Sequence, residues 1–140
     1  MSEPNSSSIT ALVPMRHHSQ RVAQKNFRLL DGKPLYQHIL ATLLQVPIVV
    51  DTDSRVIING LHETFPSVRV IDRPLELRAD NVSMNEILMY DISQAPSDFY
   101  LQTHSTNPLL RPSTISLAIH TFLQAYPRHD SLFTVTRLQS

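Results

Sequence analysis

The 140-residue sequence contains no cysteine and only two glycines, Gly32 and Gly60. Without cysteine, the chain has no disulfide framework, no thiolate metal site and no cysteine nucleophile. Two isolated glycines exclude a glycine-rich phosphate loop of either common type. The lack of cysteine fits the reducing cytoplasm, which is the location we expect.

The sequence also lacks the features that would direct it to a membrane. No apolar run approaches the length needed to span a bilayer. The first residues, MSEPNSSS, are polar and lack the apolar stretch of a signal peptide. We therefore expect no membrane partner, and we interpret residues 1–8 as a flexible tail.

The charges balance, because the chain has 12 Lys and Arg residues and 12 Asp and Glu residues. A net charge of zero argues against a surface built for nucleic acid, but it leaves room for a local basic patch. The length and the hydrophobic content of 41% are typical of one ordinary domain with its own core. We expect that domain to extend over residues 9–140.

Apolar runs of strand length alternate along the chain with segments of helical periodicity. Five runs are typical of strands: residues 9–13, 47–53, 68–71, 98–102 and 131–136. Apolar residues recur at helical spacing in residues 34–46, 54–65, 83–93 and 114–126. This alternation predicts a three-layer α/β/α sandwich with a mainly parallel, Rossmann-like sheet.

Three of the predicted helices begin at recognisable residues. Pro34 suits the first position of a helix. Ser54 precedes the next helical segment and can cap it. Ser83 is followed three residues later by Glu86, which is the spacing of a capping box.

The loop after the first predicted strand is basic and contains no acid. Its sequence is PMRHHSQRVAQKN, and its basic residues are Arg16, His17, His18, Arg21 and Lys25. In open α/β sheets, ligands bind at the carboxyl ends of the strands. We therefore interpret this basic loop, residues 14–26, as a candidate anion site.

Several motifs at strand ends point to one family. The basic loop reads Arg16-His17-His18-Ser19-Gln20, then four residues, then Lys25-Asn26. Further along come GKPL (32–35), VVDTDS (49–54), DRPLELRADNVS (72–83), LQTHSTNPLLR (101–111) and FTVT (133–136). In this order the motifs resemble the N-terminal part of the acylneuraminate (CMP-sugar) cytidylyltransferases, and the resemblance covers nearly the whole chain.

The resemblance implies a nucleotidyltransferase that binds CTP and transfers CMP to an acidic, acylneuraminate-like sugar, with release of pyrophosphate. It implies that Arg16 and Lys25 hold the triphosphate and act as the catalytic residues. Ser19 and backbone N–H groups would lie close to the same phosphates.

The remaining matched residues are expected around the base and the acceptor. The resemblance implies that Asn26, Arg73 and Ser83 line the cytidine pocket. It implies that Gln102 faces the acceptor sugar. His104 lies in the same loop and is a second candidate for contact with that sugar.

The basic loop departs from the family pattern at two places. His17-His18 stands where the family has two glycines, which removes the freedom for positive φ and for a close backbone approach. The imidazoles could donate to phosphate instead. Gln20 stands where the family has a lysine, so one phosphate-facing charge is lost.

Family members continue well beyond the position that corresponds to Ser140. Their later part carries the metal-binding aspartates and the dimerisation segment. The resemblance therefore implies Mg²⁺ as cofactor and a homodimer. The metal ligands and the dimer contacts would both lie in a region that this sequence does not contain. We assign no metal ligand within the chain.

Two alternatives to a CMP-sugar synthetase remain. Asp51-Thr52-Asp53 has the DxD pattern with which many nucleotide-sugar glycosyltransferases hold their metal. We favour the simpler interpretation, in which Asp53 or Ser54 caps the next helix. The second alternative is a non-catalytic module that binds a nucleotide without turnover.

Overall fold

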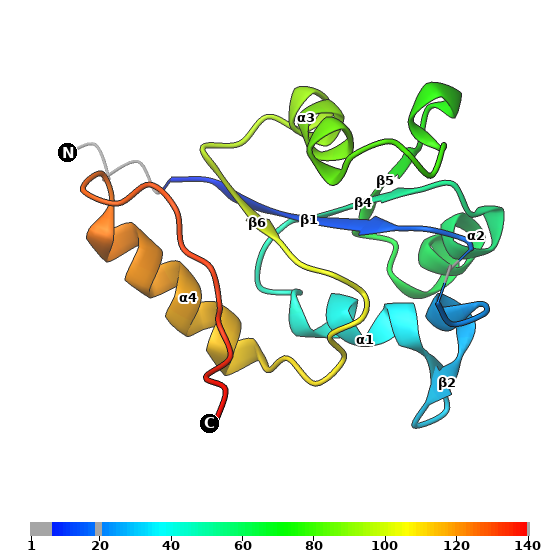
Figure 1. The fold of residues 1–140 in the computed structure, drawn as a ribbon, viewed down its shortest axis with the longest axis horizontal. Helices are drawn as coiled ribbons and strands as arrows, with labels where there is room; N and C mark the ends of the chain where they lie inside the picture. Colours follow the sequence, from blue (N-terminus) through cyan, green and yellow to red (C-terminus); the bar gives the residue numbers. More distant parts are fainter. Residues whose placement is uncertain (1–6, 19–20, 140) are drawn as a thin grey trace. The chain divides into compact units, whose positions relative to one another are not determined.

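The computed structural model describes residues 7–18 and 21–139. Two compact units divide the chain, one extending to Leu109 and one beginning at Leu110. The single domain predicted over residues 9–140 thus contains two units, and each is described by itself. Figure 1 shows the course of the chain.

A four-stranded sheet forms the centre of the first unit (Figure 1). Its strands are β1 (Ile9–Met15), β4 (Ile48–Thr52), β5 (Arg69–Asp72) and β6 (Phe99–Gln102). They lie in the order β5-β4-β1-β6, and every pair is parallel. Four of the five predicted strands and the parallel sheet are therefore confirmed.

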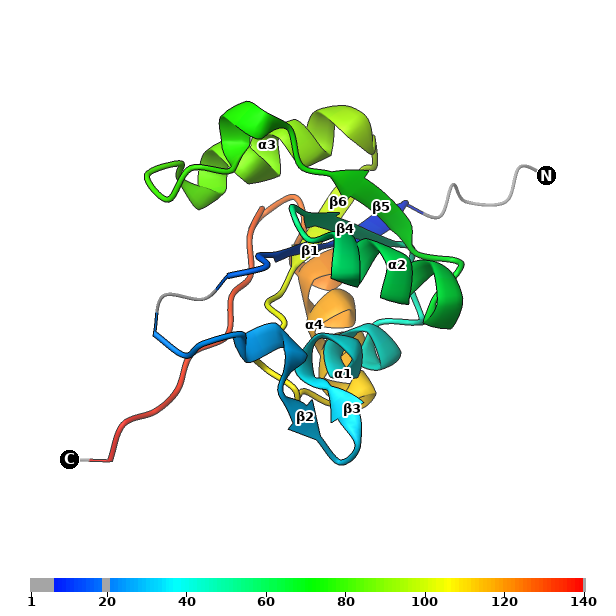
Figure 2. The same ribbon diagram turned by 90° about the vertical axis from the view of Figure 1, so that its right-hand side faces the viewer.

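Helices cover both faces of this sheet. Figure 2 shows α3 (Met84–Gln94) on one face, with α1 (Leu35–Thr42) and α2 (Arg55–Thr64) on the other. The first unit thus has the three layers predicted from the sequence. The central strands β1 and β4 are buried on both faces, which explains why they read as continuous apolar runs rather than alternating ones.

Local capping signals correctly placed the starts of two helices. The Ser54 hydroxyl accepts a hydrogen bond from the backbone N–H of Ile57 at 3.2 Å, at the start of α2. At the start of α3, the Ser83 hydroxyl accepts from the Glu86 N–H at 3.3 Å. The Glu86 carboxylate in turn accepts from the Ser83 N–H at 2.8 Å. These contacts satisfy backbone donors that have no partner within the helix.

A short hairpin leads from the basic loop into α1. Its strands, β2 (Leu29–Leu30) and β3 (Lys33–Pro34), pair antiparallel. The turn residues Asp31 and Gly32 have φ values of 51° and 75°. A two-residue hairpin turn with positive φ at both positions favours Asp-Gly. Pro34 is the N-cap of α1 rather than its first residue, and the helix ends at Thr42, before the predicted end at residue 46.

One part of the core lies between the sheet and α3. Its buried members are Leu12, Val49, Ile71 and Ala95, with Leu88, Tyr90, Ile92 and Tyr100 packed against them. Removing such apolar surface from water is the main favourable contribution to folding. This packing holds α3 against one face of the sheet.

The second unit consists of α4 (Pro112–Ala125) and a segment, residues 126–139, that has neither helix nor strand. The predicted strand at residues 131–136 is therefore wrong. Its aromatic and β-branched residues favour a strand. A strand forms, however, only where its backbone groups pair with a neighbour, and residues 131–139 are exposed.

The prediction of a flexible tail over residues 1–8 is wrong for Ser8. Its N–H and hydroxyl donate to the Asp98 carboxylate at 2.8 and 3.1 Å. Its carbonyl accepts from the Phe99 N–H at 3.0 Å. These contacts anchor Ser8 to the start of β6, whereas residues 1–6 lie outside the described ranges.

No helix within residues 7–18 and 21–139 is both long enough and apolar enough to span a bilayer.

Leu12→Ala should lower the free energy of unfolding by about 2–5 kcal/mol, because it leaves a cavity between the sheet and α3. Leu12 is 2% exposed, whereas Leu75 is 79% exposed. Leu75→Ala is therefore the matched control and should change stability by less than about 0.5 kcal/mol. Urea denaturation followed by circular dichroism measures both. Similar losses in the two variants would contradict the packing of β1 against α3.

Candidate functional site

The candidate site lies at the carboxyl ends of the four parallel strands. Because the strands are parallel, the loops that follow them meet at one edge of the sheet. These loops begin at Arg16 after β1, Asp53 after β4, Arg73 after β5 and Thr103 after β6. All four belong to the first unit.

Arg16 is the first residue after β1, and its side chain is 34% exposed. Its guanidinium Nη1 lies 3.2 Å from the Asp80 carboxylate, in the loop after β5. Its backbone carbonyl accepts a hydrogen bond from the Asn26 amide at 2.7 Å. Both the backbone and the side chain of Arg16 are thus held by other parts of the site.

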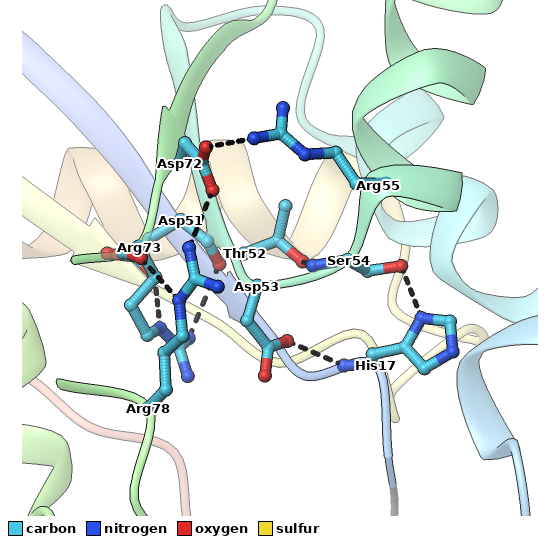
Figure 3. Close-up of polar contacts among 9 residues, drawn as sticks. All are labelled: His17, Asp51, Thr52, Asp53, Ser54, Arg55, Asp72, Arg73 and Arg78. Carbon is cyan, nitrogen blue, oxygen red and sulfur yellow. Dashed lines mark hydrogen bonds and ion pairs between the residues drawn. The ribbon is translucent and has the colours of Figure 1, made fainter. Parts of the chain in front are cut away.

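His17 is bound to the end of β4 (Figure 3). Its backbone N–H donates to the Asp53 carboxylate at 2.8 Å, and its Nδ1 lies 2.7 Å from the Ser54 hydroxyl. Its ring packs against the rings of His18 and Phe27, with centroids 4.7 and 5.0 Å away. Neither histidine has a positive φ, so neither needs the conformational freedom of a glycine. The His17 Nδ1 is directed to Ser54 rather than outward.

The basic loop ends in a short 3-10 helix, η1 (Lys25–Phe27). Gln24 turns the chain into it with a φ of 50°. Lys25 is partly buried, and within the described residues its ammonium forms no ion pair. Lys25 directly precedes Asn26, whose amide binds the Arg16 carbonyl.

Asn26 is buried, with 4% of its surface exposed. Its amide nitrogen donates to the Arg16 carbonyl at 2.7 Å. Its amide oxygen accepts from the Ser105 hydroxyl at 2.6 Å. Asn26 thus joins the basic loop to the loop after β6.

Arg73 forms a buried ion pair with Asp51 (Figure 3). The two side chains are 1% and 0% exposed, and the guanidinium Nε donates to the Asp51 carboxylate. The Arg73 N–H donates to the Thr52 carbonyl at 2.9 Å. Its carbonyl accepts from the Arg78 Nε at 2.7 Å. The guanidinium is thus directed into the interior, and the backbone of Arg73 is held by β4 and by its own loop.

A second carboxyl group, that of Asp91 on α3, lies in the same buried region and is 1% exposed. Burial, and then the hydrogen bond to Asp51 and the charge of Asp51, raise the pKa of Asp91 to about 8, against the opposing charge of Arg73. At neutral pH the cluster therefore holds one proton on Asp91 beside the Arg73–Asp51 ion pair. This arrangement keeps a second negative charge out of the interior.

The geometry does not favour the DxD alternative. Asp51 is fully buried against Arg73, so a metal would first have to break that ion pair. Asp53 accepts from the His17 N–H, and Ser54 caps α2. The Asp51 carboxylate therefore binds Arg73 in the interior, and the Asp53 carboxylate binds the basic loop. The prediction that Ser54 is the helix cap is confirmed.

A family model for cytidylyltransferases matches residues 10–140. The chain belongs to the cytidylyltransferase family. The match extends over the site described above and over most of both units. The family resemblance inferred from the strand-end motifs is therefore confirmed.

Two curated members of the family are similar to this chain. The CMP-N,N'-diacetyllegionaminic acid synthase of Legionella pneumophila is 33% identical in an alignment of 120 residues, and the match covers 79% of this chain and 51% of that protein. The 3-deoxy-manno-octulosonate cytidylyltransferase of Chlorobaculum parvum is 27% identical in an alignment of 126 residues, and the match covers 87% of this chain and 48% of that protein. The chain thus spans about half the length of the curated relatives it matches.

Solved structures of cytidylyltransferases share the fold. The CMP:2-keto-3-deoxy-manno-octonic acid synthetase complexed with CTP has a TM-score of 0.72 and 21% identity, covering 84% of this chain and 48% of that one. A 4-diphosphocytidyl-2C-methyl-D-erythritol synthase has a TM-score of 0.60 and 18% identity, covering 83% and 54%. At these identities the likeness shows the fold alone.

The structure brings some of the family-matched residues together and separates others. Arg16 and Asn26 are in direct contact, and Lys25 directly precedes Asn26 in sequence. Ser83 is exposed at the start of α3. Gln102 ends β6 and His104 follows it, and both are exposed. Ser19, and Gln20 with it, lie outside the described residues.

Sequence reasoning missed three residues of the site. Asp80 pairs with Arg16 across 64 positions, and Ser105 reaches Asn26 across 79. Asp91 lies inside a helical pattern, with no local sign of its contact with Asp51. Residues so far apart in sequence meet only through the sheet, and no motif marks their pairing. Arg78 binds the Arg73 carbonyl and the Asp72 carboxylate.

The raised pKa of Asp91 predicts a specific dependence of stability on pH. The pKa of Asp91 in the folded state, about 8, is above the ordinary aspartate value of 3.8, so between these two pH values the folded state holds a proton that the unfolded state has lost. This group should therefore lower the free energy of unfolding as pH rises from about 4 to 8, by up to about 1.4 kcal/mol per pH unit, and no further above pH 8.

Asp91→Asn removes this titration and keeps a hydrogen-bonding side chain. Urea denaturation between pH 5 and 9 should show a flatter profile for the variant than for the unchanged chain, with the variant the more stable one at pH 9. Asp130→Asn, at an exposed position, is the control and should follow the unchanged chain. Parallel profiles for Asp91→Asn and the unchanged chain would show that Asp91 does not carry the buried proton.

Proposed function

We propose that this chain forms the nucleotide-binding part of an enzyme that transfers CMP from CTP to an acidic sugar, with release of pyrophosphate. The observation that carries the proposal is the basic loop at the carboxyl end of β1, in a chain that belongs to the cytidylyltransferase family. Arg16 and Lys25 present their charges there without an acid in the same loop.

In the proposed reaction, the anomeric oxygen of the sugar forms a bond to the α-phosphorus of CTP. The bond from the α-phosphorus to the oxygen that bridges to the β-phosphate breaks, pyrophosphate leaves, and the sugar hydroxyl loses its proton. The protein contributes little covalent chemistry to such a transfer; it positions the reactants and offsets charge. Arg16 and Lys25 are the residues that we assign to the phosphates, with Ser19 close by.

The geometry refines the proposed roles around the cytidine. Asn26 is buried and bonded to Arg16 and Ser105, so we assign it a role in supporting the basic loop as well as in lining the cytidine pocket. Arg73 is 1% exposed and has its guanidinium on Asp51, so we assign it to holding the loop after β5 in place behind the cytidine. Ser83 contributes from the exposed start of α3. Gln102 and His104 are proposed to face the acceptor.

The acceptor is proposed as a sugar acid. The curated relatives are named for N,N'-diacetyllegionaminic acid and for 3-deoxy-manno-octulosonate. An acylneuraminate-like sugar, expected from the motifs, stays a prediction within this class. A cytoplasmic location and a homodimer likewise stay predictions from the sequence.

Magnesium is proposed to accompany the triphosphate, because Mg²⁺ at phosphate-transfer sites is commonly held by substrate phosphates with only one or two carboxylates. Residues 7–18 and 21–139 contain no group of three or more His, Asp or Glu side chains placed to hold a metal. The roles assigned above do not depend on the ion.

Titration calorimetry of the chain with CTP, with and without Mg²⁺, tests the nucleotide site. Arg16→Ala and Lys25→Ala should each raise the dissociation constant about tenfold or more, because each removes a charged hydrogen-bond donor from the phosphates. Arg128→Ala, at an exposed position in the second unit, is the control and should bind as the unchanged chain does. A folded chain that binds no CTP, or binds it equally well without Lys25 and Arg16, would contradict the proposed site.

Turnover distinguishes an enzyme from a non-catalytic module. CTP together with 3-deoxy-manno-octulosonate, N,N'-diacetyllegionaminic acid or N-acetylneuraminic acid should give pyrophosphate with one acceptor in preference to the others. CTP binding without pyrophosphate release, with every acceptor, would support the non-catalytic alternative.

A further inference from the structure

Ser105 is unusual in its loop because it is buried. Its neighbours His104, Thr106 and Asn107 are exposed, whereas Ser105 is 5% exposed. Its hydroxyl lies 2.6 Å from the Asn26 amide oxygen, at the short end of the range for such a bond. The Ser105 side chain of the loop after β6 is thus buried, and it contacts Asn26 of the basic loop.

The direction of each hydrogen bond follows from the Arg16 carbonyl. A carbonyl can only accept, so the Asn26 amide must present its nitrogen to Arg16, at 2.7 Å. The amide oxygen therefore faces Ser105, and the Ser105 hydroxyl must donate to it. Only a side chain with a donor fits this place, because without one the amide oxygen would be left buried and unpaired.

A second side chain holds the other end of the same peptide group. The Arg16 carbonyl and the His17 N–H belong to one planar peptide unit. The carbonyl accepts from Asn26, and the N–H donates to the Asp53 carboxylate at 2.8 Å (Figure 3). Two contacts thus fix the orientation of this unit. Asn26, held by the loop after β6, binds its carbonyl, and Asp53 at the end of β4 binds its N–H.

The peptide unit follows the α-carbon of Arg16 directly, so its orientation governs how the chain leaves β1. We propose that Ser105 and Asp53 are positioning residues for the nucleotide. Together they orient the Arg16–His17 peptide and thereby the direction in which Arg16 presents its guanidinium to the phosphates of CTP. This inference rests on the proposed function, because it assigns to that site two residues to which the family resemblance gave no role there.

Two variants of Asp53 distinguish a role in positioning the peptide from an effect of its negative charge on CTP. Asp53→Asn removes the negative charge but keeps an oxygen that can accept from the His17 N–H. Asp53→Ala removes both. If Asp53 acted only by its charge near an anion, both variants should bind CTP more tightly. Orientation predicts that Asp53→Ala binds CTP about five- to tenfold more weakly, and that Asp53→Asn does not lose affinity.

The same logic applies at the other end of the peptide. Ser105→Ala should raise the dissociation constant for CTP about five- to tenfold, and Ser105→Thr, which keeps the hydroxyl, should restore binding to within about twofold. Thr106→Ala is the matched control, because it removes an exposed hydroxyl from the same loop. Affinity is measured by titration calorimetry at a temperature where each variant is shown to be folded.

A double-mutant cycle with Arg16→Ala tests the route of the effect. In the absence of the guanidinium, Ser105→Ala and Asp53→Ala should cost little further CTP affinity, because they act through Arg16. Hydrogen exchange of the His17 amide should be faster in Asp53→Ala and in Ser105→Ala than in the Thr106→Ala control.

Three results would overturn the inference. The first is a folded Ser105→Ala or Asp53→Ala chain that binds CTP as well as the unchanged chain. The second is an equal loss of affinity in the Arg16→Ala background, which would mean that these residues act elsewhere. The third is an unchanged chain that binds no CTP, which would overturn the proposed function and this inference with it; the first two leave the proposed function standing.

Discussion

The buried ion pair between Arg73 and Asp51 is the constraint on which the rest of the site depends. An isolated charge in the interior costs several kcal/mol, so neither side chain can leave without the other. The pair connects the end of β4 to the residue after β5. The backbone of Arg73 adds hydrogen bonds to the Thr52 carbonyl and the Arg78 side chain. Asp91 adds α3 to the same cluster. The loop that ends at the cap of α3 is therefore anchored at its first residue.

The sequence predicted the parts of this structure that depend on neighbouring residues. Strands buried on both faces read as continuous apolar runs, and the helix caps Ser54 and Ser83 were placed from local spacing alone. The strand pattern correctly placed the basic loop at the carboxyl end of β1. Residues 131–136 were misassigned because composition shows only that a segment suits a strand, whereas pairing requires a neighbour that composition does not reveal.

What the sequence could not predict are the contacts that act across the sheet. Asp51 and Arg73 are 22 positions apart, and Asn26 and Ser105 are 79 apart. Each pair meets because parallel strands bring their carboxyl ends to one edge, and no spacing rule marks which side chains will touch there. Sequence analysis assigned Arg73 to the cytidine by motif, and the structure shows its guanidinium held in the interior instead.

The contact between Arg16 and Asp80 has a consequence for which anions the site can select. Asp80 is 77% exposed and already supplies a carboxylate to the guanidinium. An incoming ligand would have to displace it, exchanging one anion for another. A weakly charged ion gains little from such an exchange, whereas a triphosphate replaces the carboxylate with several charged oxygens. Under the proposed function, the carboxylate would compete with bound phosphate for the Arg16 guanidinium, and a triphosphate would be favoured over a singly charged anion.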